Sequence, residues 1–257
     1  MRIYLLPELI AKKTGILVPT EKSHYLLKVM RCRTGDSLSI INGLGKAYAA
    51  RISSISGKKV IVDILNEETA PSESPVSLVL CQGVLKGEKM DLIVQKATEL
   101  GISEIIPMVT ERSQIRETRK AARWRKIAEE AAEQCGRAVI PVVESPRGFE
   151  EILAALPNER ISAGIIFWEE MGLSPDDALI KALRSSPDKE LGKTRLAIMI
   201  GPEGGFTSLE VEKAESHGFM KASLGKRILR AETAAISAVV LVSFVIERQG
   251  IGMKSLI

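Results

Sequence analysis

The sequence predicts an α/β protein in which a small β-rich segment precedes a larger domain built on a parallel sheet. After residue 76, continuous apolar runs such as "LAIMI" alternate with helical segments, which is the pattern of a parallel sheet covered on both faces. Before residue 66, short β-rich runs are separated by the glycine turns "NGLG" and "SGK", which favour hairpins. The polar, acidic stretch "NEETAPSESP", residues 66–75, indicates a linker between the two parts.

In the first part, residues 1–70, we expect a small antiparallel barrel. A short helix over "EKSHYLLKVMR" is expected to precede its strands and to end before the "TGD" turn. The strands themselves are predicted where apolar and β-branched residues gather, at 37–41, 46–55 and 58–65.

In the second part, residues 76–257, strands and helices are expected to alternate. The apolar runs predict strands at 76–84, 103–110, 164–168, 196–200 and 221–225. Helical spacing predicts helices at 89–101, 121–137 and 207–218, another between 168 and 196, and a nearly all-apolar one at 232–250.

Composition argues against membrane, metal and disulfide chemistry. The chain of 257 residues is 45% apolar and 26% charged, as in an ordinary globular protein. Its three cysteines are widely spaced and its histidines number two, so we expect no disulfide framework and no metal site. The N-terminal "MRIYLLPELIAKKTG" does not resemble a signal peptide, and the apolar run 234–246 is too short to span a bilayer. We therefore expect a cytoplasmic protein.

The charge is uneven along the chain. The net charge is +4, but residues 1–70 hold eleven Lys or Arg against six Asp or Glu, which leaves −1 for the remainder. A second basic run, "RSQIRETRKAARWRK" at 112–126, contains a single opposing carboxylate, Glu117. Such density indicates a surface for a polyanion, although an ordinary solvated basic surface remains an alternative.

The loop "GPEGG", residues 201–205, follows an apolar strand and points to a ligand. It lacks the lysine of a phosphate-binding loop and the spacing of a dinucleotide fingerprint. Because Glu203 would repel phosphate, the loop suits a neutral or positive ligand. For Glu203 alone, a helix cap or a charge at a helix N-terminus is an alternative. The loops "FWEEMG", "GPEGGF" and "SLGKRILRAETA" all lie where ligands bind in α/β sheets.

These motifs, together with "HYLLKVMRCRTGD", "QKATELG" and "AAEQCGR", resemble the ribosomal RNA small subunit methyltransferase E family of the SPOUT superfamily over essentially the whole chain. The resemblance implies a PUA-like barrel at 1–70 and an α/β domain at 76–257 tied in a trefoil knot, against the usual rule that chains do not thread. It further implies a homodimer that uses S-adenosylmethionine to methylate N3 of a uridine in 16S rRNA.

The resemblance also assigns residues. S-adenosylmethionine carries a positive sulfonium and no phosphate, which agrees with a loop free of lysine. The implied cofactor-binding residues are Phe167, Trp168, Ile200, Gly201, Glu203, Gly204, Leu224, Gly225, Ile228, Leu229 and Arg230. The candidate RNA-binding residues are Arg2, His24, Arg31, Arg33, Arg112, Arg116, Arg119 and Arg123. Trp124 could stack on a base, but we expect it in the core.

For catalysis, Arg230 is the candidate that stabilises the uridine anion, because a guanidinium stays charged while it donates hydrogen bonds. Glu203 and Glu232 are the candidate bases. Either glutamate could instead hold Arg230 in place, and Glu232 could cap the helix that begins near it.

The sequence also bears on other possible functions. A class I methyltransferase is disfavoured because "CQGVLKGEKMD" lacks a compact Gly-x-Gly turn. A catalytically silent rRNA-binding assembly factor, or a related knotted methyltransferase acting on another RNA, remains open.

The apolar segment 232–250 motivates the dimer. A helix apolar nearly all round leaves one face exposed after packing on its own sheet, and the small residues Ala234, Ala235, Ser237 and Ala238 would allow close packing at a two-fold axis. A helix fully buried within one subunit is the alternative.

Overall fold

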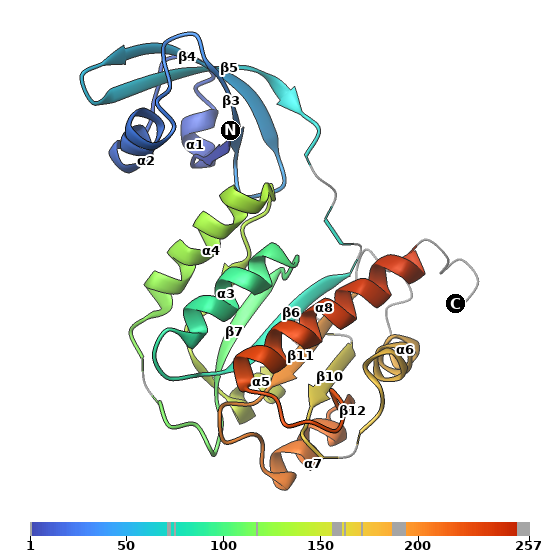
Figure 1. Ribbon diagram of the computed structural model, residues 1–257. Helices are drawn as coiled ribbons and strands as arrows, with labels where there is room; N and C mark the ends of the chain where they lie inside the picture. Colours follow the sequence, from blue (N-terminus) through green and yellow to red (C-terminus); the bar gives the residue numbers. More distant parts are fainter. Residues whose placement is uncertain are drawn as a thin grey trace. The chain divides into compact units, whose positions relative to one another are not determined.

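The computed structural model describes residues 2–70, 73–74, 76–116, 118–155, 161, 163–170, 172–186 and 194–250. The chain divides into two compact units (Figure 1). The first unit comprises Met1–Glu73 together with Glu129–Ile140, and the second comprises Ser74–Ala128 together with Pro141–Ile257.

The first unit is built on a five-stranded sheet in the order β1-β3-β4-β5-β2. The pairs β3–β4, β4–β5 and β5–β2 are antiparallel, as expected, whereas β1 pairs with β3 in parallel. Gly57, with φ at +60°, forms the tight turn between β4 and β5 and confirms the hairpin predicted at "SGK". The strands are β1 (Arg2–Tyr4), β2 (Ile16–Leu17), β3 (Ser37–Ile41), β4 (Ala47–Ser56) and β5 (Lys59–Glu68).

Short helical segments accompany this sheet, and one boundary differs from expectation. The helix expected at 21–31 is two pieces, α2 (Thr20–His24) and one π-helical turn, η1 (Tyr25–Val29), and α1 (Pro7–Ile10) was not predicted. Strand β5 continues to Glu68, so the first residues of the expected linker are strand. They pair with β4 residues 47–49, which is a tertiary contact that polarity alone does not reveal.

The end of helix α4 (Ala121–Cys135) belongs to the first unit, although it follows the linker in sequence. Lys22 forms ion pairs with Glu129 and Glu133, and Glu133 also accepts a hydrogen bond from the amide of Tyr4. Arg2 donates to the carbonyl of Gly136. These contacts join residues more than 100 positions apart, so no linear boundary drawn from the sequence could include them.

The second unit contains a parallel sheet in the order β12-β10-β11-β6-β7-β8, with β9 also pairing with β7. Every pairing in it is parallel, which confirms the predicted α/β class. The strands are β6 (Ser77–Gly83), β7 (Glu104–Val109), β8 (Val142–Val143), β9 (Arg147–Gly148), β10 (Ala163–Phe167), β11 (Arg195–Ile200) and β12 (Phe219–Ala222). The helices that accompany them are α3 (Lys89–Glu99), α4, α5 (Phe149–Ala155), α6 (Pro175–Ser185), α7 (Ser208–Ser216) and α8 (Ala231–Gly250).

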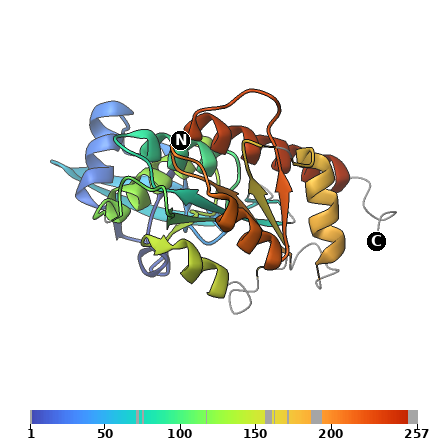
Figure 2. The same cartoon turned by 90° about the horizontal axis from the view of Figure 1, so that it is seen from below.

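Helices cover both faces of this sheet, as Figure 2 shows for α8 and α7 on opposite sides. Alternate strand residues point to opposite faces. Ile198 therefore belongs to the core that also contains residues of α3, α4, α6 and α8, whereas Met199 belongs to the core on the other face, with residues of α5 and α7. Trp124 is 1% exposed within the first of these cores, so the expectation that it is a core residue is confirmed.

Candidate active site

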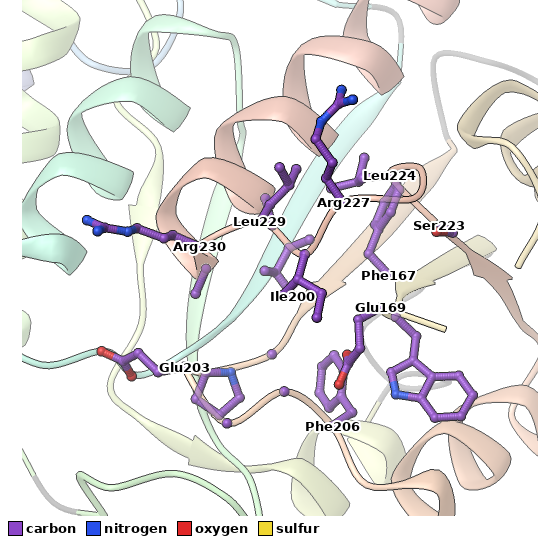
Figure 3. Close-up of a pocket in the computed structure, with 18 of the residues that line it drawn as sticks. Phe167, Glu169, Ile200, Glu203, Phe206, Ser223, Leu224, Arg227, Leu229 and Arg230 are labelled. Carbon is purple, nitrogen blue, oxygen red and sulfur yellow. The ribbon is translucent and has the colours of Figure 1, made fainter. Parts of the chain in front are cut away.

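Three loops meet at one edge of the parallel sheet and form a pocket. They follow β10, β11 and β12, and these strands are neighbours in the sheet. Because neighbouring parallel strands end at the same edge, the loops converge there, at the position where α/β proteins bind ligands. The pocket has a volume of about 420 Å³. Figure 3 shows Ile200 between the side chains of Glu203 and Glu169.

The residues expected to bind a cofactor all line this pocket, although they come from three separate stretches of sequence. These are Phe167, Trp168, Ile200, Gly201, Glu203, Gly204, Leu224, Gly225, Ile228, Leu229 and Arg230. The sequence reasoning did not identify the remaining lining residues. They are Lys89, Glu169, Pro202, Gly205, Phe206, Ser223, Arg227, Ala231 and Ala234.

The glycines of the GPEGG loop are required by close backbone approaches. A Cβ atom on Gly201 would lie 3.0 Å from the carbonyl carbon of Gly205. Gly205 has φ at +67°, and its Cβ would lie 2.7 Å from Oε1 of Glu169. Gly83 at the end of β6 meets the same loop, since its Cβ would lie 2.3 Å from the nitrogen of Pro202. The loop is therefore packed tightly against both β6 and the β10 loop.

Glu203 is held by the segment that follows β6. Its Oε1 accepts hydrogen bonds from the amide of Lys86 at 3.1 Å and from Nζ of Lys89 at 3.2 Å. Partial burial opposes ionisation of Glu203, but the hydrogen bond from the Lys86 amide and the interaction with Lys89 outweigh it and lower its pKa. Lys89 also lies 3.7 Å from Oε2 of Glu232, so one ammonium bridges both glutamates.

These contacts bear on whether Glu203 and Glu232 cap helices or hold Arg230 in place. Helix α7 is capped by Thr207 and Glu210, which form a capping box, so the idea that Glu203 caps it is wrong. Glu232 lies in the first turn of α8, where a negative charge is favourable. The glutamates pair with Lys89, whereas the side chain of Arg230 has no hydrogen-bond or ion-pair partner among the described residues.

The loop after β10 contributes a carboxylate that has no ion-pair partner among the described residues. Glu169 lines the pocket, lies against Gly205 and is exposed, and no described residue forms an ion pair with it. Beside it, the ring of Trp168 has Nζ of Lys221 at 5.5 Å from its centroid. The pocket thus offers two carboxylates, Glu203 and Glu169, next to apolar walls.

Four of the candidate RNA-binding residues form contacts within the protein. Arg2 donates to Gly136, and Arg123 forms an ion pair with Asp91 at 2.7 Å. Arg112 donates to the carbonyls of Gly204 and Phe206 in the β11 loop, and Arg116 donates to the carbonyl of Glu111. The other candidates, His24, Arg31, Arg33 and Arg119, are exposed.

Lys89 is the most informative residue that the sequence reasoning missed. It lies in the segment "LKGEKMD", which lacks a Gly-x-Gly turn and so does not by itself indicate a ligand site. That segment follows strand β6, the neighbour of β11 in the sheet. The rule that loops after parallel strands share one edge would have brought Lys89 to the pocket, had β6 been placed next to β11.

Among the described residues, no group of three or more His, Cys, Asp or Glu side chains is arranged to hold a metal ion. No helix in the described ranges is both long enough and apolar enough to cross a membrane.

Comparison with known proteins identifies both parts of the chain. Residues 72–243 match an RNA methyltransferase domain, and residues 18–65 match an RNA methyltransferase PUA domain. The chain is 32% identical over 229 residues to ribosomal RNA small subunit methyltransferase E from Bacillus subtilis, which covers 87% of this chain and 88% of that protein.

Solved structures give the same result. The crystal structure of a ribosomal RNA small subunit methyltransferase E from Neisseria gonorrhoeae, bound to S-adenosyl methionine, aligns with a TM-score of 0.81 at 32% identity and covers 95% of this chain and 97% of that one. A methyltransferase from Legionella pneumophila, in complex with the same cofactor, aligns with a TM-score of 0.79 at 32% identity, covering 95% and 96%. The resemblance seen in the sequence is confirmed, and the chain belongs to the ribosomal RNA small subunit methyltransferase E family.

Proposed function

We propose that this protein transfers a methyl group from S-adenosylmethionine to N3 of a uridine in 16S rRNA of the small ribosomal subunit. The observation that carries the proposal is the pocket, in which the residues that the family resemblance assigns to the cofactor line one cavity. Relatives named for this activity, and a relative bound to the cofactor, support it.

The residues of the pocket fit this cofactor. A side chain at Gly201 would crowd the backbone of Gly205, and one at Gly205 would collide with the carboxylate of Glu169, so glycines keep the shape of the loop that lines the pocket. Phe167, Ile200 and Leu229 supply apolar walls for a planar base. Glu169 supplies a carboxylate without a protein partner among the described residues, suited to the positive charges of the ligand.

S-adenosylmethionine, when bound, supplies a methyl group whose bond to the sulfonium breaks as N3 of the uridine takes the methyl. The N3 proton must leave before or during this step, which leaves negative charge on the uracil ring and its carbonyl oxygens. Arg230 is the residue that we assign to this charge, because it lines the pocket and its guanidinium is not paired with another described residue. Figure 3 shows Arg230 extending away from the loop that bears it.

Glu203 is a poor candidate for the base. A general base works best with a pKa near the working pH, and the pKa of Glu203 is lowered. Its Oε1 is also engaged by the Lys86 amide and by Lys89. We therefore assign Glu203 and Glu232 to positioning, through the ammonium of Lys89 that bridges them, and expect the proton to pass to solvent.

The RNA-contact surface belongs to this proposal. We assign rRNA binding to the first domain, residues 1–70, through His24, Arg31 and Arg33, and to Arg119 in the second. These side chains are exposed, and cations at such positions contact phosphates without reading sequence. Arg2, Arg112, Arg116 and Arg123 are assigned instead to the contacts that they make within the protein.

We also propose a homodimer, but through a different face of α8 from the one that the sequence predicts. Ala235 and Ala238 are buried in their own subunit, so they cannot form the two-fold contact expected of them. The exposed apolar face of α8 is formed instead by Val240, Leu241 and Phe244, of which Phe244 is 54% exposed. An apolar helix face of this kind is stabilised when a second copy covers it.

Two further features follow from the family resemblance. We propose that the loops after β11 and β12 form the trefoil knot of this family, because both loops line the same pocket. The proposed substrate also implies a cytoplasmic location, where small ribosomal subunits are made.

The alternative functions make different predictions for cofactor binding. A catalytically silent assembly factor would not need the pocket, whereas the enzyme requires it. Isothermal titration of the purified chain with S-adenosylmethionine separates the two, and we expect binding to one site per chain. No heat of binding at millimolar cofactor would refute the enzyme. A knotted methyltransferase of another RNA would bind the cofactor but leave 16S rRNA unmodified.

A further inference from the structure

The GPEGG loop is held in place by a segment that the sequence assigned to RNA contact. Nη1 of Arg112 donates to the carbonyl of Gly204 at 3.0 Å and to the carbonyl of Phe206 at 3.2 Å. The amide of the preceding residue, Glu111, donates to Oε1 of Glu210 at 2.9 Å. Residues 111 and 112 therefore contact the loop and the start of α7 together.

These contacts restrain two peptide planes, Gly204–Gly205 and Phe206–Thr207, which lie on either side of the Gly205–Phe206 peptide. The first plane is held at its carbonyl by Arg112 and at the amide of Gly205, which donates to Pro202 at 2.9 Å. The second plane is held at the carbonyl of Phe206 by Arg112 and at the amide of Thr207, which donates to Oε2 of Glu210 at 2.9 Å. One guanidinium therefore sets both planes.

The peptide between these two planes forms part of the pocket wall. Gly205 and Phe206 line the pocket, and a Cβ on Gly201 would lie 3.2 Å from the nitrogen of Phe206. Gly205 also carries a positive φ of +67°, a conformation that glycine adopts without a steric penalty but does not by itself enforce. An external restraint is needed to hold it there, and Arg112 supplies one.

We propose that Arg112 is a positioning residue for the cofactor, which holds the GPEGG loop in its binding conformation. The inference rests on the proposed function, in that the pocket binds S-adenosylmethionine. Arg112 acts through the loop carbonyls and need not touch the cofactor. Hydrogen bonds from a charged donor are stronger than neutral ones, so their loss is expected to weaken cofactor binding measurably.

Arg119 provides a matched control in the same basic segment. Its side chain is exposed and forms no hydrogen bond or ion pair with the residues that the structure describes. Arg112→Gln and Arg119→Gln each remove one positive charge. Only the first removes a guanidinium that contacts the GPEGG loop. If Arg112 served only to bind RNA, the two substitutions would have the same effects on binding. If Arg112 positions the loop, only Arg112→Gln would weaken cofactor binding.

The test measures cofactor and RNA binding separately on the full-length chain. Titration with S-adenosylmethionine in the absence of RNA is expected to show a Kd raised about tenfold by Arg112→Gln and unchanged by Arg119→Gln. Binding of unmodified 16S rRNA at several salt concentrations is expected to weaken for Arg119→Gln, with a salt slope reduced by about 1. In turnover, Arg112→Gln should raise KM for the cofactor more than it lowers kcat.

Arg112→Lys keeps the positive charge, and it provides a second variant in case Arg112→Gln does not fold. Lysine lacks the planar guanidinium, so we expect it to restore the cofactor Kd only in part. If Arg112 acted only through its charge, Arg112→Lys would bind cofactor and RNA as wild type does. A cofactor Kd unchanged in both Arg112 variants would overturn the inference. Wild-type protein that binds no cofactor would refute the proposed function itself.

Discussion

At the scale of single residues, the chemistry of the pocket depends on which cation pairs with which carboxylate. The sequence identified Arg230, Glu203 and Glu232 but could not show that Lys89 joins the two glutamates, because Lys89 and Glu203 lie 114 positions apart in the chain. Partial burial opposes ionisation of Glu203, but the hydrogen bond from the Lys86 amide, together with this pairing, lowers its pKa.

Replacing Arg230 with alanine is expected to raise the barrier to methyl transfer by about 2–4 kcal/mol, by analogy with the loss of an oxyanion donor. Cofactor affinity should fall much less, because the charge develops only during the reaction. Single-turnover methylation of 16S rRNA measures the barrier, and Lys226→Ala removes a neighbouring cation as a control. Methylation by Arg230→Ala at a near-normal rate would contradict the assignment.

Replacing Glu203 with glutamine tests whether this residue is a base. Because we assign it to positioning, Glu203→Gln should weaken cofactor binding but leave the shape of the pH–rate profile unchanged. Loss of a limb from the profile would identify Glu203 as the base after all.

The lowered pKa of Glu203 also predicts how stability changes with pH. A carboxylate whose pKa is lower in the folded state stabilises the fold above its unfolded pKa, and this contribution is lost as the pH falls through its folded pKa. The unfolding free energy of wild type should therefore exceed that of Glu203→Gln at neutral pH. Denaturant titrations should show this difference disappearing in acid, and a difference that grows with acidity would contradict it.

At the scale of elements, the sequence predicted most strands and helices of the α/β part because their periodicity is long and regular, but it missed α5 and placed β12 at 221–225 rather than Phe219–Ala222. It also missed β1, β2, β8 and β9, which have only two or three residues and are defined by their pairing partners. The cofactor loops could be predicted from their glycines and from the ends of apolar strands. Their supports, such as Arg112, could not, because those contacts depend on which strands are neighbours.

The capping box of α7 is an element-scale feature that can be tested directly. Thr207 and Glu210 satisfy amides at the start of the helix, immediately after the GPEGG loop. Thr207→Ala should lower the free energy of unfolding by about 1 kcal/mol. The exposed helical residue Thr233 is the matched control, and Thr233→Ala should cause no loss. Equal effects of the two substitutions in urea denaturation would refute the stabilising role of the cap.

At the scale of the whole molecule, the sequence predicted two domains and a dimer, and the dimer rests on one helix face. Apolar periodicity cannot separate a buried face from an exposed one when nearly every position of α8 is apolar. The structure makes the distinction, since Ala235 and Val239 are buried while Leu241 and Phe244 are exposed.

Sedimentation velocity of the purified protein is expected to give twice the chain mass of 28.0 kDa. Phe244→Glu places a charge on the exposed face of α8 and should shift the protein toward the monomer, whereas Glu247→Gln on the same helix should not. A wild-type monomer that is independent of concentration would end the dimer proposal.

The proposed methylation of N3 of a uridine in 16S rRNA can be tested in a single reaction with purified components. Purified protein is incubated with S-adenosylmethionine and 16S rRNA from cells that lack the modification, and the rRNA is digested to nucleosides and analysed by mass spectrometry. We expect one 3-methyluridine per rRNA, formed by wild type and strongly reduced with Arg230→Ala. A methyl group on a ribose or another base, or no methylation at all, would contradict the proposed reaction.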